Sequence, residues 1–347
     1  MRVLLTGHKG YIGAVAAPIL RDAGHDVVGL DTDLFAGCNF SGQPQEIREL
    51  PVDLRDVTEK DLDGFDAVVH LAALSNDPLG DLEPEVTYDI NHHASVRLAK
   101  LAKKAKVKRF VFSSSCSTYG AAGDLFHDET DALNPVTAYA ESKVFVERDL
   151  SQMADEFFSP TCLRNATAYG VSSRLRLDIV LNDLVASAYA KGLVYIKSDG
   201  TPWRPIVHIR DIAAAILSVL EAPREVVHNQ TFNVGRTDEN YRIRELAEIV
   251  AEAVPSCRIE YAPGGGPDTR CYRVNCDLIR KVLPSFRPQW DARQGAQELY
   301  ESYRAAGLTA SDVDSGRYIR LRHLRTLMNQ GDVDQSLRWH RQAAVVA

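Results

Sequence analysis

The chain has 347 residues, a length that fits one large domain or two coupled domains around an ample hydrophobic core. Its 40 basic and 47 acidic side chains give a net charge of −7 without a basic block, which argues against nucleic acid as a partner. No run of about 18 apolar residues predicts a membrane span, and six scattered cysteines show no metal-ligand spacing. We therefore expect a cytoplasmic protein without a metal site.

Short apolar runs alternate with helical patterns through the first half of the chain. Runs of strand length cover residues 2–5, 26–30, 67–71 and 109–113, and helical spacing covers residues 12–23 and 86–105. Because the short runs lack polar alternation, they are typical of strands covered on both faces. The pattern predicts the α/β class, with a Rossmann-type doubly wound parallel sheet.

The second half is more broken, and no clean linker separates it from the first. We expect strands over residues 159–164, 206–208 and 230–234, and helices over 177–191 and 244–253. Residues 262–267 read as a loop, because proline and glycine dominate them. The tail from about Leu308 is rich in Arg and His and is expected to end in a helix.

A glycine-rich segment, Thr6–Gly13, lies between the first predicted strand and the first predicted helix. Glycines at such a turn let a dinucleotide pyrophosphate approach the N–H groups of a helix N-terminus, where the helix dipole favours anions. A glycine triplet alone is a weak indication of dinucleotide binding, but its position between a predicted strand and a predicted helix makes the indication strong. The residues expected to hold the cofactor here are Gly7, Gly10, Tyr11, Ile12 and Gly13.

Carboxylates follow the next two strands at positions suited to the adenosine part of a dinucleotide. Asp31 ends the second strand, about 20 residues after the glycine segment, where a carboxylate accepts both ribose hydroxyls and repels a 2′-phosphate. No Arg or Lys occupies residues 32–35, which favours NAD over NADP. Asp53 and Leu54 follow the expected third strand, where they could bind the adenine amino group and form an apolar wall.

The pair Tyr139 and Lys143 is spaced four residues apart, which puts both side chains on one face of a helix. An ammonium beside a phenol lowers the phenol pKa and prepares it for proton transfer at a carbinol or carbonyl oxygen. The serine-rich run of residues 113–117 ends a strand on the sheet edge where ligands bind. A serine hydroxyl there could hydrogen-bond the reacting oxygen.

Together, the glycine spacing, the run from Ser113 to Gly120 and the Tyr-x-x-x-Lys pair resemble the extended short-chain dehydrogenase/reductases over about residues 1–280. This family comprises nucleotide-sugar epimerases, dehydratases and reductases. The resemblance implies Ser115, Tyr139 and Lys143 as catalytic residues and Asn91 as a structural asparagine. It also implies that the cofactor contacts Leu71, Ala72, Ala73, Ser113, Tyr139 and Lys143.

The resemblance further implies a nucleotide-diphosphate sugar as the substrate. In the family, an Arg before the His of a segment like Trp203–His208 binds the diphosphate, so Arg204 is the expected anchor. A second family Arg has no counterpart at its usual place, where glycine stands, and Arg270 could replace it. The residues expected to contact the substrate are Ser115, Cys116, Ser117, Thr167, Asn182, Arg204 and Arg270.

Two positions beside Ser115 separate the possible reactions. The 4,6-dehydratases usually carry Asp-Glu there and decarboxylases tend to carry Glu second, whereas this chain has Cys116 and Ser117. We therefore expect an NAD-dependent epimerase. The alternatives are an NAD(P)-dependent ketoreductase or dehydrogenase, which needs the same three catalytic residues, and a non-catalytic NAD-binding protein.

The domain organisation follows from the same expectations. Residues 1–170 would form the NAD-binding Rossmann domain, with residues of about 205–235 contributing to it. Residues 171–347 would form a smaller C-terminal α/β substrate-binding domain and the tail. The resemblance also implies a homodimer, with the helix over 86–105 and the helix holding Tyr139 at its interface.

Overall fold

The computed structural model describes residues 1–75, 77, 83–120, 125–262 and 271–340. Its largest sheet has seven parallel strands in the order β11-β7-β5-β4-β1-β2-β3. The order runs outward from β1 in both directions, so the predicted doubly wound parallel sheet is confirmed. These strands are β1 (Arg2–Thr6), β2 (Asp26–Leu30), β3 (Glu49–Leu50), β4 (Ala67–His70), β5 (Arg109–Ser115), β7 (Ser159–Asn165) and β11 (Gln230–Val234).

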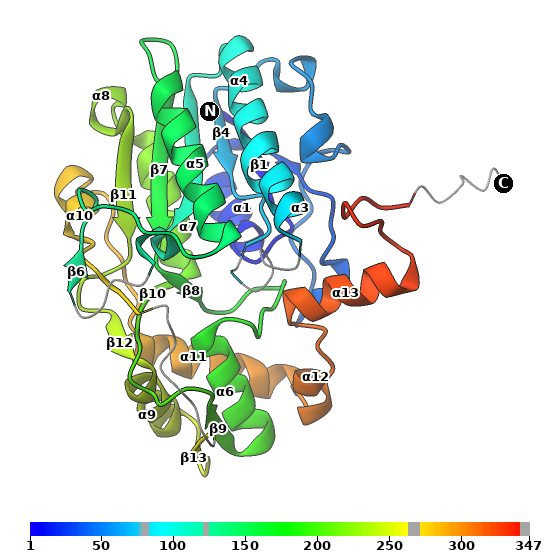
Figure 1. Cartoon of the computed structure of the whole chain (residues 1–347), viewed down its shortest axis with the longest axis vertical. Helices are drawn as coiled ribbons and strands as arrows, with labels where there is room; N and C mark the ends of the chain where they lie inside the picture. The colour runs from blue at the N-terminus through cyan, green and yellow to red at the C-terminus, as the bar shows by residue number, and fades with distance from the viewer. Residues whose placement is uncertain (76, 78–82, 121–124, 263–270, 341–347) are drawn as a thin grey trace.

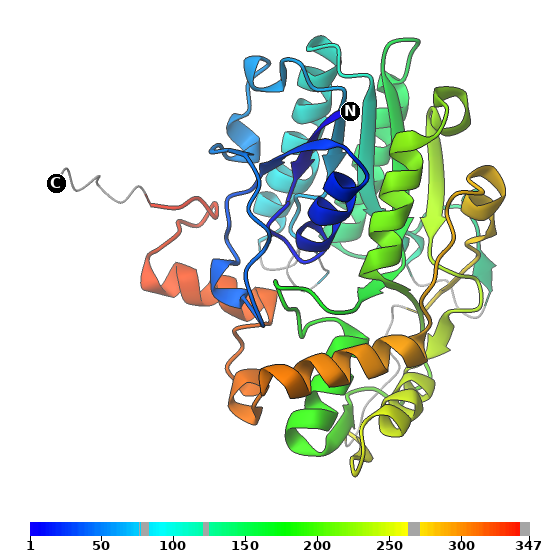
Figure 2. The same ribbon diagram turned by 180° about the vertical axis from the view of Figure 1, so that it is seen from behind.

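The sheet is covered by helices on both faces, and alternate residues of β1 show how. Val3 and Leu5 belong to the hydrophobic cluster shared with α1 (Gly13–Asp22) and α7 (Ile209–Glu221). Leu4 belongs to the opposite cluster, which includes residues of α4 (Ser95–Lys104) and α5 (Ala138–Met153). Successive side chains of a strand point to opposite faces, so an apolar run is what a two-sided core requires. Figures 1 and 2 show these two helical layers in turn.

The helix predicted over residues 86–105 is interrupted. It consists of α3 (Pro84–Tyr88), a π-helical segment η4 (Asp89–Ala94) and α4. Asn91 projects from the π-helical segment, where its side chain accepts a hydrogen bond from the Leu74 nitrogen at 2.8 Å and donates one to the Leu74 oxygen at 3.0 Å. Asn91 therefore holds the chain that follows β4, which agrees with the structural role expected for it.

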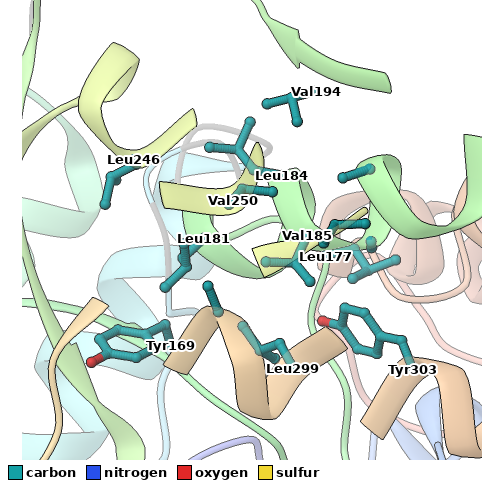
Figure 3. Packing of buried hydrophobic residues seen from close by; sticks show 14 of the residues in the cluster. Tyr169, Leu177, Leu181, Leu184, Val185, Val194, Leu246, Val250, Leu299 and Tyr303 are labelled. Atoms are coloured by element: carbon teal, nitrogen blue, oxygen red, sulfur yellow. The ribbon is translucent and has the colours of Figure 1, made fainter. Parts of the chain in front are cut away.

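A second hydrophobic core lies below the large sheet in Figure 1, between α6 (Val180–Lys191), α9 (Ile243–Ala253) and α11 (Ala292–Ala306). Figure 3 shows Leu181 and Val185 of α6 packed close to Leu299 of α11. The helix predicted from residue 177 starts at Val180. Two small sheets border this core: β8 (Thr167–Tyr169), β10 (Trp203–His208) and β12 (Asn240–Arg242), then β9 (Leu193–Ile196) with β13 (Arg258–Tyr261). A third small sheet pairs β6 (Phe126–His127) with β14 (Arg273–Val274), and Val274 packs in a separate cluster with Cys116 and Tyr119.

The tail after α11 returns from this second core toward the large sheet (Figures 1 and 2). It contains α12 (Ala310–Asp314) and α13 (Arg320–Gln330), and two short helices precede α11, namely α8 (Arg224–Val227) and α10 (Asp277–Val282). The expected terminal helix is wrong for residues 331–340, which form a loop closed by an antiparallel bridge between Val333 and Trp339. Within the part of the chain that the structure describes, no helix is both long and apolar enough to span a bilayer.

Candidate active site

A cavity of about 900 Å³ opens at the carboxyl ends of β1, β2, β4 and β5 and extends to α6 and β10. In doubly wound sheets this edge is where ligands bind. Most of the site residues expected from the sequence lie on its wall. They are Gly7, Gly10, Tyr11, Ile12, Gly13, Asp31, Asp53, Leu54, Leu71, Ala72, Ala73, Ser113, Ser115, Ser117, Tyr139, Lys143, Thr167 and Arg204.

The glycine segment forms a turn that larger residues could not adopt. Gly7 has a φ of +73°, and a Cβ on it would lie 2.8 Å from the Ala72 nitrogen. A Cβ on Gly13 would lie 2.0 Å from the Gly7 oxygen, so the start of α1 could not pack as closely on the turn. The result is a bare backbone surface at the N-terminus of α1, which fits a dinucleotide pyrophosphate.

Asp31 stands at the end of β2 on the cavity wall. One carboxylate oxygen accepts a hydrogen bond from the Asp33 nitrogen at 2.8 Å, and the other accepts one from the Lys9 nitrogen at 3.0 Å. Each oxygen retains a further lone pair, so the carboxylate has the capacity to accept hydrogen bonds from two ribose hydroxyls as well. Burial raises the pKa of Asp31, and these two backbone hydrogen bonds oppose that effect. The residues present therefore fit NAD at this end of the cavity.

Asp53 also reaches the wall, but its carboxylate is already engaged. Its oxygens accept hydrogen bonds from the Arg55 nitrogen and from the Arg55 guanidinium, at 2.8 to 2.9 Å. Burial works to raise the pKa of Asp53, yet the Arg55 hydrogen bonds outweigh it and the pKa is lowered. The contact with adenine expected from the sequence would share the carboxylate with Arg55.

The three expected catalytic residues converge from two elements. Ser115 ends β5, while Tyr139 and Lys143 lie on the first turns of α5. The Ser115 hydroxyl accepts hydrogen bonds from the Ser117 nitrogen at 3.1 Å and the Ser117 hydroxyl at 2.9 Å. The Lys143 ammonium donates to the Ser113 oxygen at 2.8 Å and lies 5.7 Å from the centre of the Tyr139 ring. The site thus holds a phenol, a hydroxyl and a buried amine on one wall.

The expectation that Lys143 would lower the phenol pKa is wrong for this structure. Burial raises the pKa of Tyr139 to about 12, Asp77 adds to the rise, and a hydrogen bond with Ser115 opposes it. Burial likewise lowers the pKa of Lys143 to about 7, against the influence of Glu147. Removal from water favours the neutral form of both groups, and it is the largest influence on the pKa of each.

Two expected substrate contacts come from paired strands. Thr167 on β8 lies opposite Ile206 of β10 in the parallel ladder, and Arg204 lies on β10 two residues earlier. Both line the cavity, and the Arg204 side chain is mostly buried. A buried guanidinium facing a cavity of this size suits a phosphate group.

Two expected contacts do not reach the cavity. Cys116 is fully buried, and its thiol donates to the Arg164 oxygen at 3.1 Å. Asn182 is also fully buried; its amide oxygen accepts from the Gly170 nitrogen, and its amide nitrogen donates to the Tyr11 hydroxyl and the Arg176 oxygen. Its hydrogen bonds join α6 to the glycine segment, so it has a structural role here. Arg270 lies outside the described residues.

The structure adds residues to the wall that the sequence reading missed. Asp77 and Arg176 lie there, and the Arg176 guanidinium donates to Ser75 and pairs with Asp178. Charged and leucine residues alternate in Arg174-Leu175-Arg176-Leu177-Asp178, and this pattern could have indicated Arg176. Charged side chains are seldom buried beside apolar ones unless they are paired. Four further wall residues come from the tail: Ile319, Arg320, Arg322 and Leu337. No local motif indicated these four.

Comparisons with known proteins agree with this geometry. The sequence model described as "NAD dependent epimerase/dehydratase family" matches residues 3–235. The chain is 30% identical over 326 residues to UDP-glucose 4-epimerase of Corynebacterium glutamicum, covering 88% of this chain and 97% of that one. It resembles the structure of MoeE5 in complex with UDP-glucuronic acid and NAD, at 27% identity and a TM-score of 0.76, covering 88% and 99% of the two chains. UDP-glucose 4-epimerase of Thermotoga maritima shares the fold, with 24% identity, a TM-score of 0.76 and the same coverage.

Proposed function

The chain belongs to the NAD-dependent epimerase/dehydratase family, and we propose that it epimerises a nucleotide-diphosphate sugar through a transient keto sugar. The observation that carries the proposal is the convergence of Ser115, Tyr139 and Lys143 on one wall of the cavity that the glycine segment also lines. When bound, NAD accepts a hydride from a sugar carbon and returns it. The protein's own residues then have to move one proton and hold the sugar.

Tyr139 is the proton carrier in this proposal. In the oxidative half-reaction, the proton of the sugar hydroxyl passes to the Tyr139 oxygen while the carbon-bound hydrogen leaves as hydride. In the return step the Tyr139 phenol protonates the carbonyl oxygen. Taking the hydroxyl proton requires Tyr139 as the phenolate. Burial raises its pKa to about 12, and the hydrogen bond with Ser115 opposes that rise and so favours the phenolate.

Elimination chemistry is disfavoured by the two positions after Ser115. Burial raises the pKa of the Cys116 thiol, which points away from the cavity. The Ser117 hydroxyl donates a hydrogen bond to Ser115, and a serine hydroxyl is too weak an acid to serve as the general acid of an elimination. Neither residue supplies the extra acid and base that dehydration needs, so the site favours epimerisation over dehydration.

The proposed substrate class follows from two further residues that line the cavity. Arg204 offers a buried guanidinium for a diphosphate, and Thr167 offers a hydroxyl near the sugar. Because the named relatives are UDP-glucose 4-epimerases and MoeE5 holds UDP-glucuronic acid, UDP-sugars are the first compounds to test. We further propose a homodimer through α4 and α5, which light scattering on the purified protein would check.

The experiment starts with the protein as purified. Denaturation, chromatography and mass measurement identify any released nucleotide, and UDP- and dTDP-sugars are then screened for epimerisation without added cofactor. We expect near-stoichiometric NAD and turnover by wild type, with turnover lost in Tyr139→Phe while NAD stays bound. Full activity of Tyr139→Phe contradicts the mechanism. An empty protein that reduces keto-sugar nucleotides with added NADH or NADPH supports a reductase instead.

A further inference from the structure

The tail of the chain forms part of the dinucleotide cavity. Beyond α13, residues Val333–Trp339 form a loop closed by an antiparallel bridge between its two ends. Inside it, the Asp334 carboxylate accepts hydrogen bonds from the Ser336 and Arg338 nitrogens. Leu337 has a φ of +59°, which is costly for a leucine, and is buried on the cavity wall. The loop is therefore a preformed unit that presents Leu337 to the cavity.

The same loop is attached to the two segments expected to hold the adenosine half of NAD. The Trp339 indole donates to the Thr32 oxygen at 2.6 Å, directly after Asp31. The Arg55 guanidinium donates to the Ser336 oxygen at 2.7 Å while it also holds Asp53. These contacts connect the loop to the segments that follow β2 and β3, at sequence separations of 307 and 281 residues.

A further attachment is ionic. The Arg338 guanidinium pairs with Asp56, with one N–O distance of 3.0 Å, and lies 4.0 Å from the Asp53 carboxylate. Both side chains of the Arg338–Asp56 pair are partly exposed, so the pair is weak and reversible. Trp339 is likewise partly exposed, whereas the Arg55 side chain is mostly buried. Two of the three attachments therefore lie near the surface of the molecule.

An apolar cluster lies under the loop. Leu324, Val333 and Leu337 of the tail are buried together with Leu74, and the partly buried Leu34, Phe35 and Ile90 pack against them. Five members of this cluster also line the cavity: Leu34, Phe35, Leu74, Ile90 and Leu337. The tail therefore closes an apolar wall at the end of the cavity that Asp31 and Leu54 border.

We propose that Val333–Trp339, named here the C-terminal clasp, closes over the adenosine half of bound NAD and must detach before NAD can leave. The clasp would keep NAD on the protein through many turnovers, which suits a reaction that regenerates its cofactor in every cycle. This inference rests on the NAD site of the proposed function, and it adds that the clasp controls how long NAD stays bound.

The test measures cofactor release from the full chain. The protein is loaded with NADH, excess NAD is added, and the decay of bound NADH fluorescence gives the dissociation rate constant. The double variant Arg338→Ala, Trp339→Phe removes two attachments while leaving Leu337 and the cavity wall in place. Arg258→Ala, which breaks an exposed ion pair with Glu260 on β13, is the control.

A dissociation rate constant at least fivefold above wild type in the double variant, with no change in the control, is the expected result. A smaller increase overturns the proposal. Release of NADH is measured without any sugar. A chain that binds NADH but epimerises no sugar nucleotide would therefore contradict the proposed activity, while the release rates would still test the clasp.

Wild-type protein provides a second measurement, in case the double variant does not fold. Amide hydrogen exchange is compared with and without NAD. Slower exchange at Ser336–Trp339 on NAD addition supports the clasp. Slower exchange at Gly7–Gly13 without any change at Ser336–Trp339 overturns it, because NAD would then bind without engaging the loop.

Discussion

The Lys143 ammonium donates a hydrogen bond to the Ser113 carbonyl oxygen at 2.8 Å, so the amine is anchored to the end of β5. The same amine lies 4.7 Å from the centre of the Phe112 ring and is almost fully buried. This position explains why burial, and not the neighbouring phenol, dominates its protonation. Because burial lowers the pKa of Lys143 to about 7, the charge of this amine changes near neutral pH.

Lys143→Met should change how stability depends on pH. The pKa of Lys143 is about 7 in the folded chain against an ordinary 10.5, so between these values the unfolded chain binds one more proton. The free energy of unfolding of wild type therefore rises with pH in this window, by at most about 1.4 kcal/mol per pH unit from this group. Urea unfolding from pH 6 to 9 should show that the rise is smaller in Lys143→Met. Lys108→Met, at an exposed site, should keep the wild-type slope; equal slopes in all three proteins would contradict the assignment.

Asp31→Ala should weaken NAD binding and its selectivity over NADP. Hydrogen bonds to a charged group contribute about 1.5–3 kcal/mol, so we expect the Kd for NAD to rise roughly 10- to 150-fold. The Kd for NADP should rise less, because the repulsion of the 2′-phosphate is also removed. Titration calorimetry measures both. Asp26→Ala, at the other end of β2, is the matched control, and an unchanged NAD/NADP ratio in Asp31→Ala would show that Asp31 is not the ribose partner.

Glu147→Gln should destabilise the fold. Glu147 and Arg164 are both buried and pair at 2.7 Å, and Glu147 also accepts a hydrogen bond from Ser114. Removing one partner leaves an uncompensated buried charge, which costs about 3–5 kcal/mol. Urea unfolding measures the loss. Glu260→Gln, which breaks the exposed pair with Arg258, should cost less than about 1 kcal/mol; a similar cost for both variants would argue against the special role of the buried pair.

Asn182→Ala should act on stability and not on substrate binding. It removes three buried hydrogen bonds, to Gly170, Tyr11 and Arg176, so we expect a loss of about 1–3 kcal/mol or more in unfolding free energy. The KM for the UDP-sugar that wild type epimerises should stay within about twofold. A stable variant with a strongly raised KM would restore the sequence-based expectation that Asn182 contacts the diphosphate.

The local sequence pattern was sufficient to predict the bounds of an element where those bounds depend on the element's own residues. The strands β2 and β11 coincide with the predicted residues 26–30 and 230–234, because each is a short run with a strand pattern between turns. Boundaries were missed where a distant contact decides them. The π-helical segment at Asp89–Ala94 positions Asn91 against Leu74. The spacing of apolar residues does not reveal this contact, so it could not predict the interruption of the helix.

The amino-acid sequence by itself determined individual strands of the sheet, the glycine turn and the Tyr139–Lys143 pair, because each depends on neighbours within a few residues. Only the tertiary structure decided that Cys116 and Asn182 turn away from the cavity, and that burial dominates the pKa values of Lys143 and Tyr139. It alone brought Leu337 to the wall beside Thr32 and Arg55. Burial and long-range hydrogen bonds depend on which segments meet in space, and contacts some 300 residues apart leave no periodic trace along the chain.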